Sequence, residues 1–185
     1  DVNQARVREL SSALGIEGTS NYQQILNDSR VQAVSIVTPS RTHYKVAKEC
    51  IEAGKDVLVE KPLTMDVAEA EGLVNIADKN NRILMVGHVF RYHPAVQELR
   101  RRINEGELGK LQTIISNRLA FGLPRKDMGV IYALGIHELD MFCYLMEVDY
   151  PESVTAVASK AYSQDIEETA MLAVDFGDIK GYAFE

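Results

Sequence analysis

Three short polar segments could carry out chemistry, and each follows an apolar run. They are Thr38-Pro39-Ser40, Glu60-Lys61-Pro62 and Gly87-His88. The ammonium of Lys61 could hydrogen-bond a substrate hydroxyl, and it would become a better proton donor beside a like charge such as an oxidised nicotinamide. Taken alone, Glu60-Lys61-Pro62 more often indicates a solvent-facing turn, because such short motifs are common.

A second group of candidates lies further along the chain. His137 falls in a predicted helix, and an imidazole suits proton uptake near neutral pH. A lone helical histidine is more often structural. Candidates for gripping a substrate are Arg91, Tyr92, Arg118 and Arg125. Arg125 belongs to a loop with Gly and Pro, where a guanidinium could meet a diphosphate. His88 and His93 are expected to be structural or helix-capping residues.

The apolar runs alternate with helical patterns in the first half of the chain. Residues 33–37, 57–59 and 83–86 are predicted strands, and residues 42–53 and 66–79 are predicted helices. Gly54 is placed to end the first of these helices, and Asp66 with Glu69 forms a capping box for the second. Strands joined by crossover helices are parallel, so a partial doubly wound α/β (Rossmann-like) sheet is expected, covered on both faces. Its ligands should bind at the carboxyl ends of the strands.

The pattern changes after Arg91. A helix should begin at Pro94, a strand should cover residues 110–120, and another helix should run from about 135 to 147. Residues 153–161, 169–176 and 179–184 alternate like strands of an open, largely antiparallel sheet. We therefore expect a partial dinucleotide-binding domain over 1–91 and part of an α+β domain over 92–185.

Composition excludes some classes of function. The chain has 185 residues, 46% of them hydrophobic and 25% charged, with a net charge of -7. This charge argues against nucleic acid or an anionic membrane as partner. The basic triplet Arg100-Arg101-Arg102 is expected to form a solvated helix face. Cys50 and Cys143 are expected to be buried free thiols. The absence of a signal peptide and of a long apolar run favours the cytoplasm. We expect no metal site.

Five segments, taken in their order along the chain, together resemble the Gfo/Idh/MocA oxidoreductase family. They are residues 34–43, residues 52–62, Gly87-His-Val-Phe-Arg-Tyr-His-Pro94, the turn at 106–109 and Gly135-Ile-His-Glu-Leu-Asp140. The segments around Gly87 and at 129–131 are most similar to the UDP-N-acetylglucosamine 3-dehydrogenase-like branch. The resemblance covers essentially the whole chain. It implies NAD or NADP bound on the first domain, and a homo-oligomer, a dimer or tetramer, formed through the open sheet of the second.

The resemblance also implies roles for individual residues. Lys61 would hold the substrate hydroxyl and the nicotinamide ribose, and His137 would be the acid/base. The other implied residues are Thr38, Pro39, Ser40, His43, Glu60 and Arg91 for the cofactor, and Tyr92, Arg125 and Asp140 for the substrate. The implied reaction is hydride transfer between NAD(P) and a secondary hydroxyl of a sugar or sugar nucleotide.

One position departs from the family pattern. An aspartate commonly precedes the histidine by four residues, about one helical turn, and here that residue is Ala133. His137 thus lacks a possible orienting carboxylate. Asp140, three residues after His137, is a candidate substitute, although its position favours helix packing or a hydrogen bond instead. Slow turnover or an altered proton path is expected. Two alternatives stay open, a non-catalytic dinucleotide- or sugar-sensing homologue and an NAD-dependent elimination or glycosidase enzyme.

The glycine pattern bears on the length of the protein. None of the twelve glycines falls in a GxGxxG motif, and the chain opens on a predicted helix rather than a strand. The chain also stops within a predicted strand at Glu185. We therefore expect a chain truncated at both ends, which by itself would have negligible dinucleotide affinity and no activity.

Overall fold

The computed structural model describes residues 1–119, 127–160 and 165–185. These residues form two compact units, Asp1–Gly87 and His88–Glu185. The second unit begins close to the domain boundary at residue 91 that the sequence suggests.

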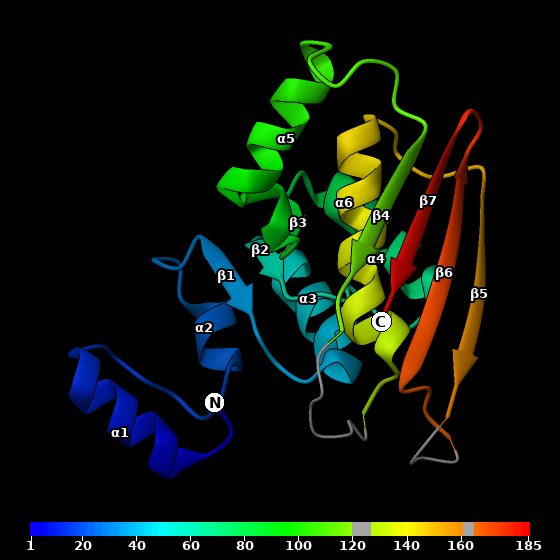
Figure 1. Ribbon diagram of the computed structural model, residues 1–185. Helices are drawn as coiled ribbons and strands as arrows, with labels where there is room; N and C mark the ends of the chain where they lie inside the picture. The colour runs from blue at the N-terminus through cyan, green and yellow to red at the C-terminus, as the bar shows by residue number, and fades with distance from the viewer. Residues whose placement is uncertain (120–126, 161–164) are drawn as a thin grey trace. The chain divides into compact units, whose positions relative to one another are not determined.

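Unit 1 is built around a parallel sheet. Its strands are β1 (Ala33–Ile36), β2 (Asp56–Val59) and β3 (Leu84–Val86), hydrogen-bonded in the order β1-β2-β3 (Figure 1). Ala33 to Ile36 pair in register with Asp56 to Val59, and the crossover helices are α3 (His43–Glu52) and α4 (Val67–Asn80). The strands, their parallel direction and both helices confirm the sequence-based predictions.

The core of unit 1 lies between this sheet and α3 and α4. Its buried members are Leu26, Ile36, Ala47, Cys50, Ile51, Val57, Val59, Leu73 and Ala77. Alternate strand residues point the other way, and Leu58 and Met85 keep 39% and 38% of their surface exposed. Within the described part of unit 1, the expectation of a sheet buried on both faces therefore holds for one face only.

Local signals set the helix ends in unit 1. Gly54 has φ +76°, and the Asp66 side chain accepts a hydrogen bond from the Glu69 amide at the start of α4. Helix α1 (Gln4–Leu14) ends at Gly15, whose φ is +66°. None of the residues of α1 is buried. The short helix α2 (Gln23–Asn27) was not predicted.

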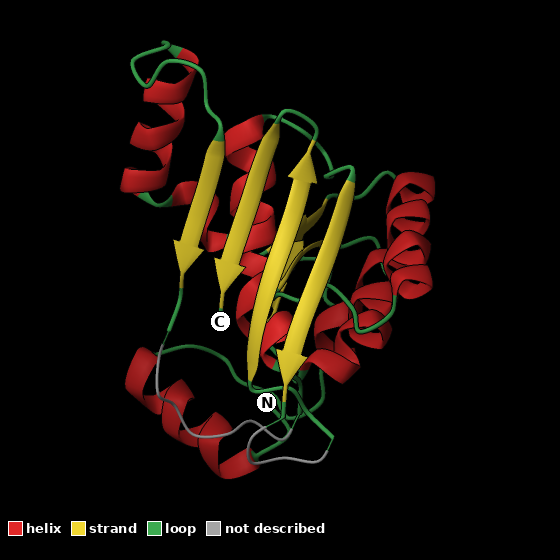
Figure 2. Cartoon of the chain, turned by 45° about the vertical axis from the view of Figure 1, so that its right-hand side comes forward, coloured by secondary structure: helices red, strands yellow, loops and turns green. Residues whose placement is uncertain are grey.

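Unit 2 packs helices on a mixed sheet. The chain runs through a 3-10 turn (Val89–Tyr92), α5 (Pro94–Asn104), β4 (Thr113–Asn117), a π-helical turn (Ile131–Gly135), α6 (Ile136–Met146), β5 (Ser153–Ser159), β6 (Thr169–Phe176) and β7 (Ile179–Phe184). The strand order is β4-β7-β6-β5, with β4 parallel to β7 and the other two pairs antiparallel. Figure 2 shows α6 behind these four strands. The open, largely antiparallel sheet is confirmed.

Helix α6 is held against the sheet by one large side chain. Phe142 is fully buried and clusters with Leu172, Val174 and Ala183. A β-carbon added to Gly181 on β7 would lie 2.9 Å from the Phe142 ring and 3.3 Å from Ile114. Glycine at this position therefore gives the aromatic ring its room on the sheet.

We predict that Gly181→Ala lowers the free energy of unfolding of unit 2 by about 1–3 kcal/mol, because the added methyl overpacks the Phe142 contact. Chemical denaturation measures this change. Gly72→Ala in the interior of α4 is the control, since its β-carbon would approach Tyr44 only to 3.8 Å. An unchanged unfolding midpoint for Gly181→Ala would contradict the packing argument.

The basic triplet on α5 and the two cysteines have the surroundings that the sequence predicts. On α5, Arg101 pairs with Glu98, Glu105 and Glu107, which confirms a solvated, ion-paired helix face. Cys50 and Cys143 are buried free thiols, and burial raises the pKa of Cys50 to about 11. Among the described residues, no helix combines the length and apolar character that crossing a membrane requires.

Candidate functional site

The carboxyl ends of the three strands of unit 1 meet at one edge of the sheet. The Glu60 amide donates to the Ile36 carbonyl at 2.9 Å, and the Gly87 amide donates to the Val59 carbonyl at 2.8 Å. This register places the segments after β1, β2 and β3 side by side. The edge carries the predicted cofactor residues Thr38, Pro39, Ser40, Glu60 and Lys61, of which Thr38 and Pro39 are exposed and the other three are partly buried.

Short contacts shape this edge. The Thr42 hydroxyl lies 2.7 Å from the Pro39 carbonyl and 2.8 Å from the Thr38 hydroxyl, which closes the 3-10 turn Ser40–Thr42. A β-carbon on Gly87 would lie 3.5 Å from the Glu60 carboxylate, so this acidic group lies directly against the end of β3. The Lys61-Pro62 peptide bond is cis. Glu60 and Lys61 thus lie next to each other at the carboxyl edge of the sheet.

His43 lies underneath these loops. It opens α3 and is 1% exposed. Its Nδ1 is 2.8 Å from the Pro62 carbonyl oxygen, and its Nε2 is 2.8 Å from the Thr38 carbonyl oxygen. Sequence reasoning placed His43 near the cofactor, but not between these two carbonyls, because that contact depends on the fold.

In unit 2, two predicted residues bind each other. Arg91 lies with its Nε 2.8 Å and its Nη2 2.6 Å from Asp140 Oδ1, and its guanidinium lies 5.5 Å from the Tyr144 ring. The hydrogen bond that Arg91 donates to Asp140 raises the pKa of Arg91. His88 Nδ1 is 3.7 Å from the other Asp140 oxygen. Both predicted residues are therefore engaged in an ion pair within unit 2.

The other predicted substrate residues are less constrained. Tyr92 is 61% exposed on the 3-10 turn that precedes α5. Arg125 lies outside the described residues. His93, expected to be a cap, does cap α5, since its Nδ1 accepts a hydrogen bond from the Ala95 amide.

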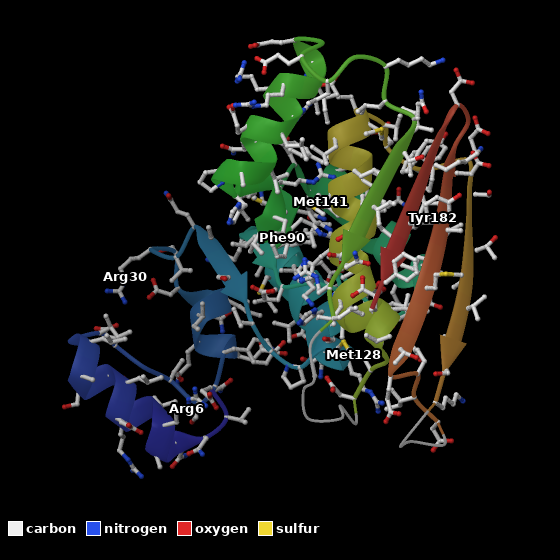
Figure 3. The ribbon with its side chains drawn as sticks, in the orientation of Figure 1. Arg6, Arg30, Phe90, Met128, Met141 and Tyr182 are labelled. Atoms are coloured by element: carbon white, nitrogen blue, oxygen red, sulfur yellow. The ribbon has the colours of Figure 1, made fainter. Side chains whose placement is uncertain are left out.

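His137 contacts an aromatic residue that sequence reasoning missed. It lies in the first turn of α6, partly buried, and the Phe90 ring centroid is 5.0 Å from its imidazole at an interplanar angle of 77°. Arg118 places its guanidinium 4.5 Å from the Phe90 centroid (Phe90 is labelled in Figure 3). Edge-to-face contacts of this kind restrict ring orientation. Phe90 stands only two residues from His88 in a segment already singled out, but nothing local points it toward His137.

Behind this aromatic contact lies a buried carboxylate. Glu138 is fully buried, and Arg118 Nε donates to its Oε1 at 2.8 Å. The Ser116 hydroxyl is 3.4 Å from the same oxygen. Burial, followed by the charge of Glu138, raises the pKa of Glu185 to about 8. Arg118, a candidate for binding substrate, thus forms an ion pair with the buried carboxylate of Glu138.

We predict that Arg118→Met destabilises unit 2 by about 3–5 kcal/mol, because it leaves Glu138 buried without its cation. Adding Glu138→Gln to that variant should restore much of the loss, because the uncompensated charge is then removed. Denaturant unfolding of the single and double variants tests this coupling. An Arg118→Met variant with the same denaturant midpoint as the wild type would refute this coupling.

Metal ligation finds no support in the described part of the chain. There, no group of three or more His, Cys, Asp or Glu side chains is arranged to hold a metal ion.

Comparison with known proteins matches both units. Residues 1–88 match the model described as the oxidoreductase family with an NAD-binding Rossmann fold, and residues 96–183 match the GFO/IDH/MocA C-terminal domain.

Individual relatives agree with these matches. UDP-N-acetylglucosamine 3-dehydrogenase of Acidithiobacillus ferrooxidans is 35% identical over 99% of this chain and 57% of its own length. The NADP(+)-dependent scyllo-inositol 2-dehydrogenase IolW of Bacillus subtilis is 28% identical over 91% of this chain and 49% of its own. The crystal structure of a probable dehydrogenase from Thermotoga maritima superposes with a TM-score of 0.90 at 25% identity, covering 100% of this chain and 59% of that one. The chain spans about half the length of the curated relatives it matches.

Proposed function

The chain belongs to the Gfo/Idh/MocA oxidoreductase family, and on that premise we propose that its protein transfers a hydride between NAD(P) and a secondary hydroxyl of a sugar or sugar nucleotide. The observation that carries the proposal is the meeting of Thr38-Pro39-Ser40 with Glu60-Lys61 at the carboxyl edge of a parallel sheet. Ligands of such sheets bind at this edge. The sugar is supported by the dehydrogenases of UDP-N-acetylglucosamine and scyllo-inositol among the relatives.

The residues at this edge fit a nicotinamide cofactor. Thr38 and Pro39 are exposed. Gly87 has no side chain, so the Glu60 carboxylate can lie against the end of β3. In the proposal, Thr38, Pro39 and Ser40 contact the nicotinamide half of NAD(P), and Glu60 accepts hydrogen bonds from its ribose hydroxyls. A bound oxidised nicotinamide supplies the acceptor for the hydride. The choice between NAD and NADP is part of the test below.

Lys61 and His137 have different proposed roles toward the substrate. The Lys61 ammonium donates to the substrate hydroxyl and to the ribose, and so fixes the alcohol for reaction. His137 takes the hydroxyl proton, because loss of hydride from an undeprotonated alcohol would leave a costly cationic centre. We assign Phe90 to restricting the His137 ring through the edge contact at 5.0 Å. Tyr92 and Arg125 are proposed as substrate contacts, and the Arg91–Asp140 pair as their support.

The first test uses the intact protein that carries this chain. A screen of sugar nucleotides and inositols should reveal one that reduces NAD or NADP. With that substrate, Lys61→Met should lower kcat by about 10²–10⁴-fold, because a donor to the reacting hydroxyl is lost.

The control is Lys48→Met, since Lys48 lies on the solvent side of α3 with a side chain 41% exposed. It should retain wild-type activity. No cofactor reduction with any sugar, or full activity of Lys61→Met, would contradict the proposal. Substrate cleavage without net reduction would identify the elimination or glycosidase alternative.

A second candidate function, a non-catalytic dinucleotide or sugar sensor, is favoured by one observation. Ala133 stands where the family commonly has an aspartate, and the structure buries it to 4% exposure in the π-helical turn before α6. A sensor would bind cofactor and sugar, but it would have no turnover for Lys61→Met to remove.

We predict that Ala133→Asp raises kcat of the intact enzyme, because a carboxylate one turn from His137 would stabilise its imidazolium. Steady-state kinetics test this prediction, with Ala133→Asn as the uncharged control of similar size. Equal turnover of Ala133→Asp and the wild type would show that this position does not limit the proton path.

One face of the unit 2 sheet carries exposed apolar side chains. The face of the unit 2 sheet opposite α6 exposes Ile115, Val157 and Met171 by 61%, 64% and 40%. We propose that this apolar face forms the contact of a homodimer or homotetramer. A cytoplasmic enzyme is proposed, with a small-molecule substrate and neither nucleic acid nor membrane as partner.

A further inference from the structure

His43 bridges two loops in a way that constrains its protons. Its two ring nitrogens each lie 2.8 Å from a backbone carbonyl oxygen, that of Thr38 after β1 and that of Pro62 after β2. Carbonyl oxygens only accept hydrogen bonds, and a neutral imidazole carries a single N–H. Both contacts are hydrogen bonds only when both ring nitrogens are protonated.

The bridge links the two segments that form the proposed nicotinamide site. Thr38 leads into Pro39 and Ser40, and Pro62 directly follows Lys61. With 1% of its surface exposed, His43 has no solvent-accessible face for a ligand. It therefore contributes to the site through the loops that it holds.

We propose that His43 is a positioning residue that carries protons on both ring nitrogens and ties the Thr38–Ser40 loop to the Lys61–Pro62 turn. This inference rests on the proposed function and deepens it. The two loops are fixed before the cofactor arrives, so binding does not bear the full entropic cost of ordering them. In this proposal His43 acts on the cofactor through the two loops, not by the direct contact that the family resemblance implies.

Unit 1 contains a matched control for this arrangement. Lys55 is also buried, at 5% exposure, and its Nζ donates at 2.8 Å to two backbone carbonyls, those of Asp28 and Val31. It precedes β2 and therefore lies at the amino edge of the sheet, opposite the proposed site. Removing either side chain deletes a buried donor that joins two loops, but only His43 joins the loops of the site.

The first measurement concerns the protons themselves. In the intact protein labelled with ¹⁵N-histidine, NMR spectroscopy near neutral pH should show both His43 ring nitrogens bonded to hydrogen. The assignment is made by its loss in His43→Gln. An unprotonated Nδ1 or Nε2 would overturn the doubly donating bridge. This result does not depend on any activity of the protein.

The second measurement compares His43→Gln with Lys55→Gln. Both should lower the thermal midpoint, but only His43→Gln should speed amide hydrogen exchange in residues 38–42 and 60–63. It should also weaken NAD(P) binding by about tenfold, the equivalent of one lost hydrogen bond, and Lys55→Gln should not. His43→Asn, whose amide can also serve only one of the two differently placed carbonyls, should behave like His43→Gln, and it replaces His43→Gln should that variant fail to fold.

These measurements distinguish the positioning role of His43 from the proposed function of the protein. Unchanged exchange in the site loops, or equal weakening of NAD(P) binding by Lys55→Gln, would overturn the positioning role. A wild-type protein that binds no NAD(P) would instead overturn the proposed function, and the NMR and exchange data would still decide whether His43 orders the loops.

Discussion

Parallel pairing of β1 with β2 is the constraint on which the candidate site depends. Ile36 lies opposite Val59, so the chain leaves both strands at the same level of the sheet. Thr38-Pro39-Ser40 and Glu60-Lys61 become neighbours because of this register. A shift by one residue would turn Ile36 and Val59, both buried, away from the core. The burial of apolar side chains in unit 1 therefore fixes the position of Lys61 at the carboxyl edge of the sheet.

Unit 2 obeys a similar logic with different parts. Phe142 packs α6 against the sheet, in the space that Gly181 provides. This packing determines where the first turn of α6 lies. His137 and Glu138 are adjacent in this turn but have different surroundings. His137 meets the Phe90 ring, whereas Glu138 is buried against Arg118. Arg118 joins the two environments, since its guanidinium also lies over Phe90. Packing and charge balance together hold the proposed acid/base.

Much of this arrangement follows from local sequence. The apolar runs around Val34, Leu58 and Met85 predict the strands, and turn signals such as Gly54 and Asp66 act within a few residues. The motif Glu60-Lys61-Pro62 could be placed at a strand end for the same reason. Interactions between distant residues could not be predicted. Arg91 and Asp140 are 49 positions apart, and nothing in the sequence indicates that the fold pairs them.

Other features depend on backbone geometry that side-chain patterns do not encode. The π-helical turn before α6 shows no signal in the spacing of apolar residues. The bridge made by His43 requires the exact placement of two carbonyls from different loops, although its position at the start of a helix was predicted. The exposure of α1 could not be predicted either, because periodicity indicates which side of a helix is apolar, not whether a neighbouring element covers it.

The most direct test of the central claim is an experimental structure of the intact protein with bound NAD(P). The account predicts that the nicotinamide ring lies at the carboxyl edge of β1 and β2, with the Lys61 Nζ within hydrogen-bonding distance of the ribose or of a bound sugar hydroxyl. A nicotinamide bound elsewhere, or Lys61 directed into solvent away from it, would contradict the account.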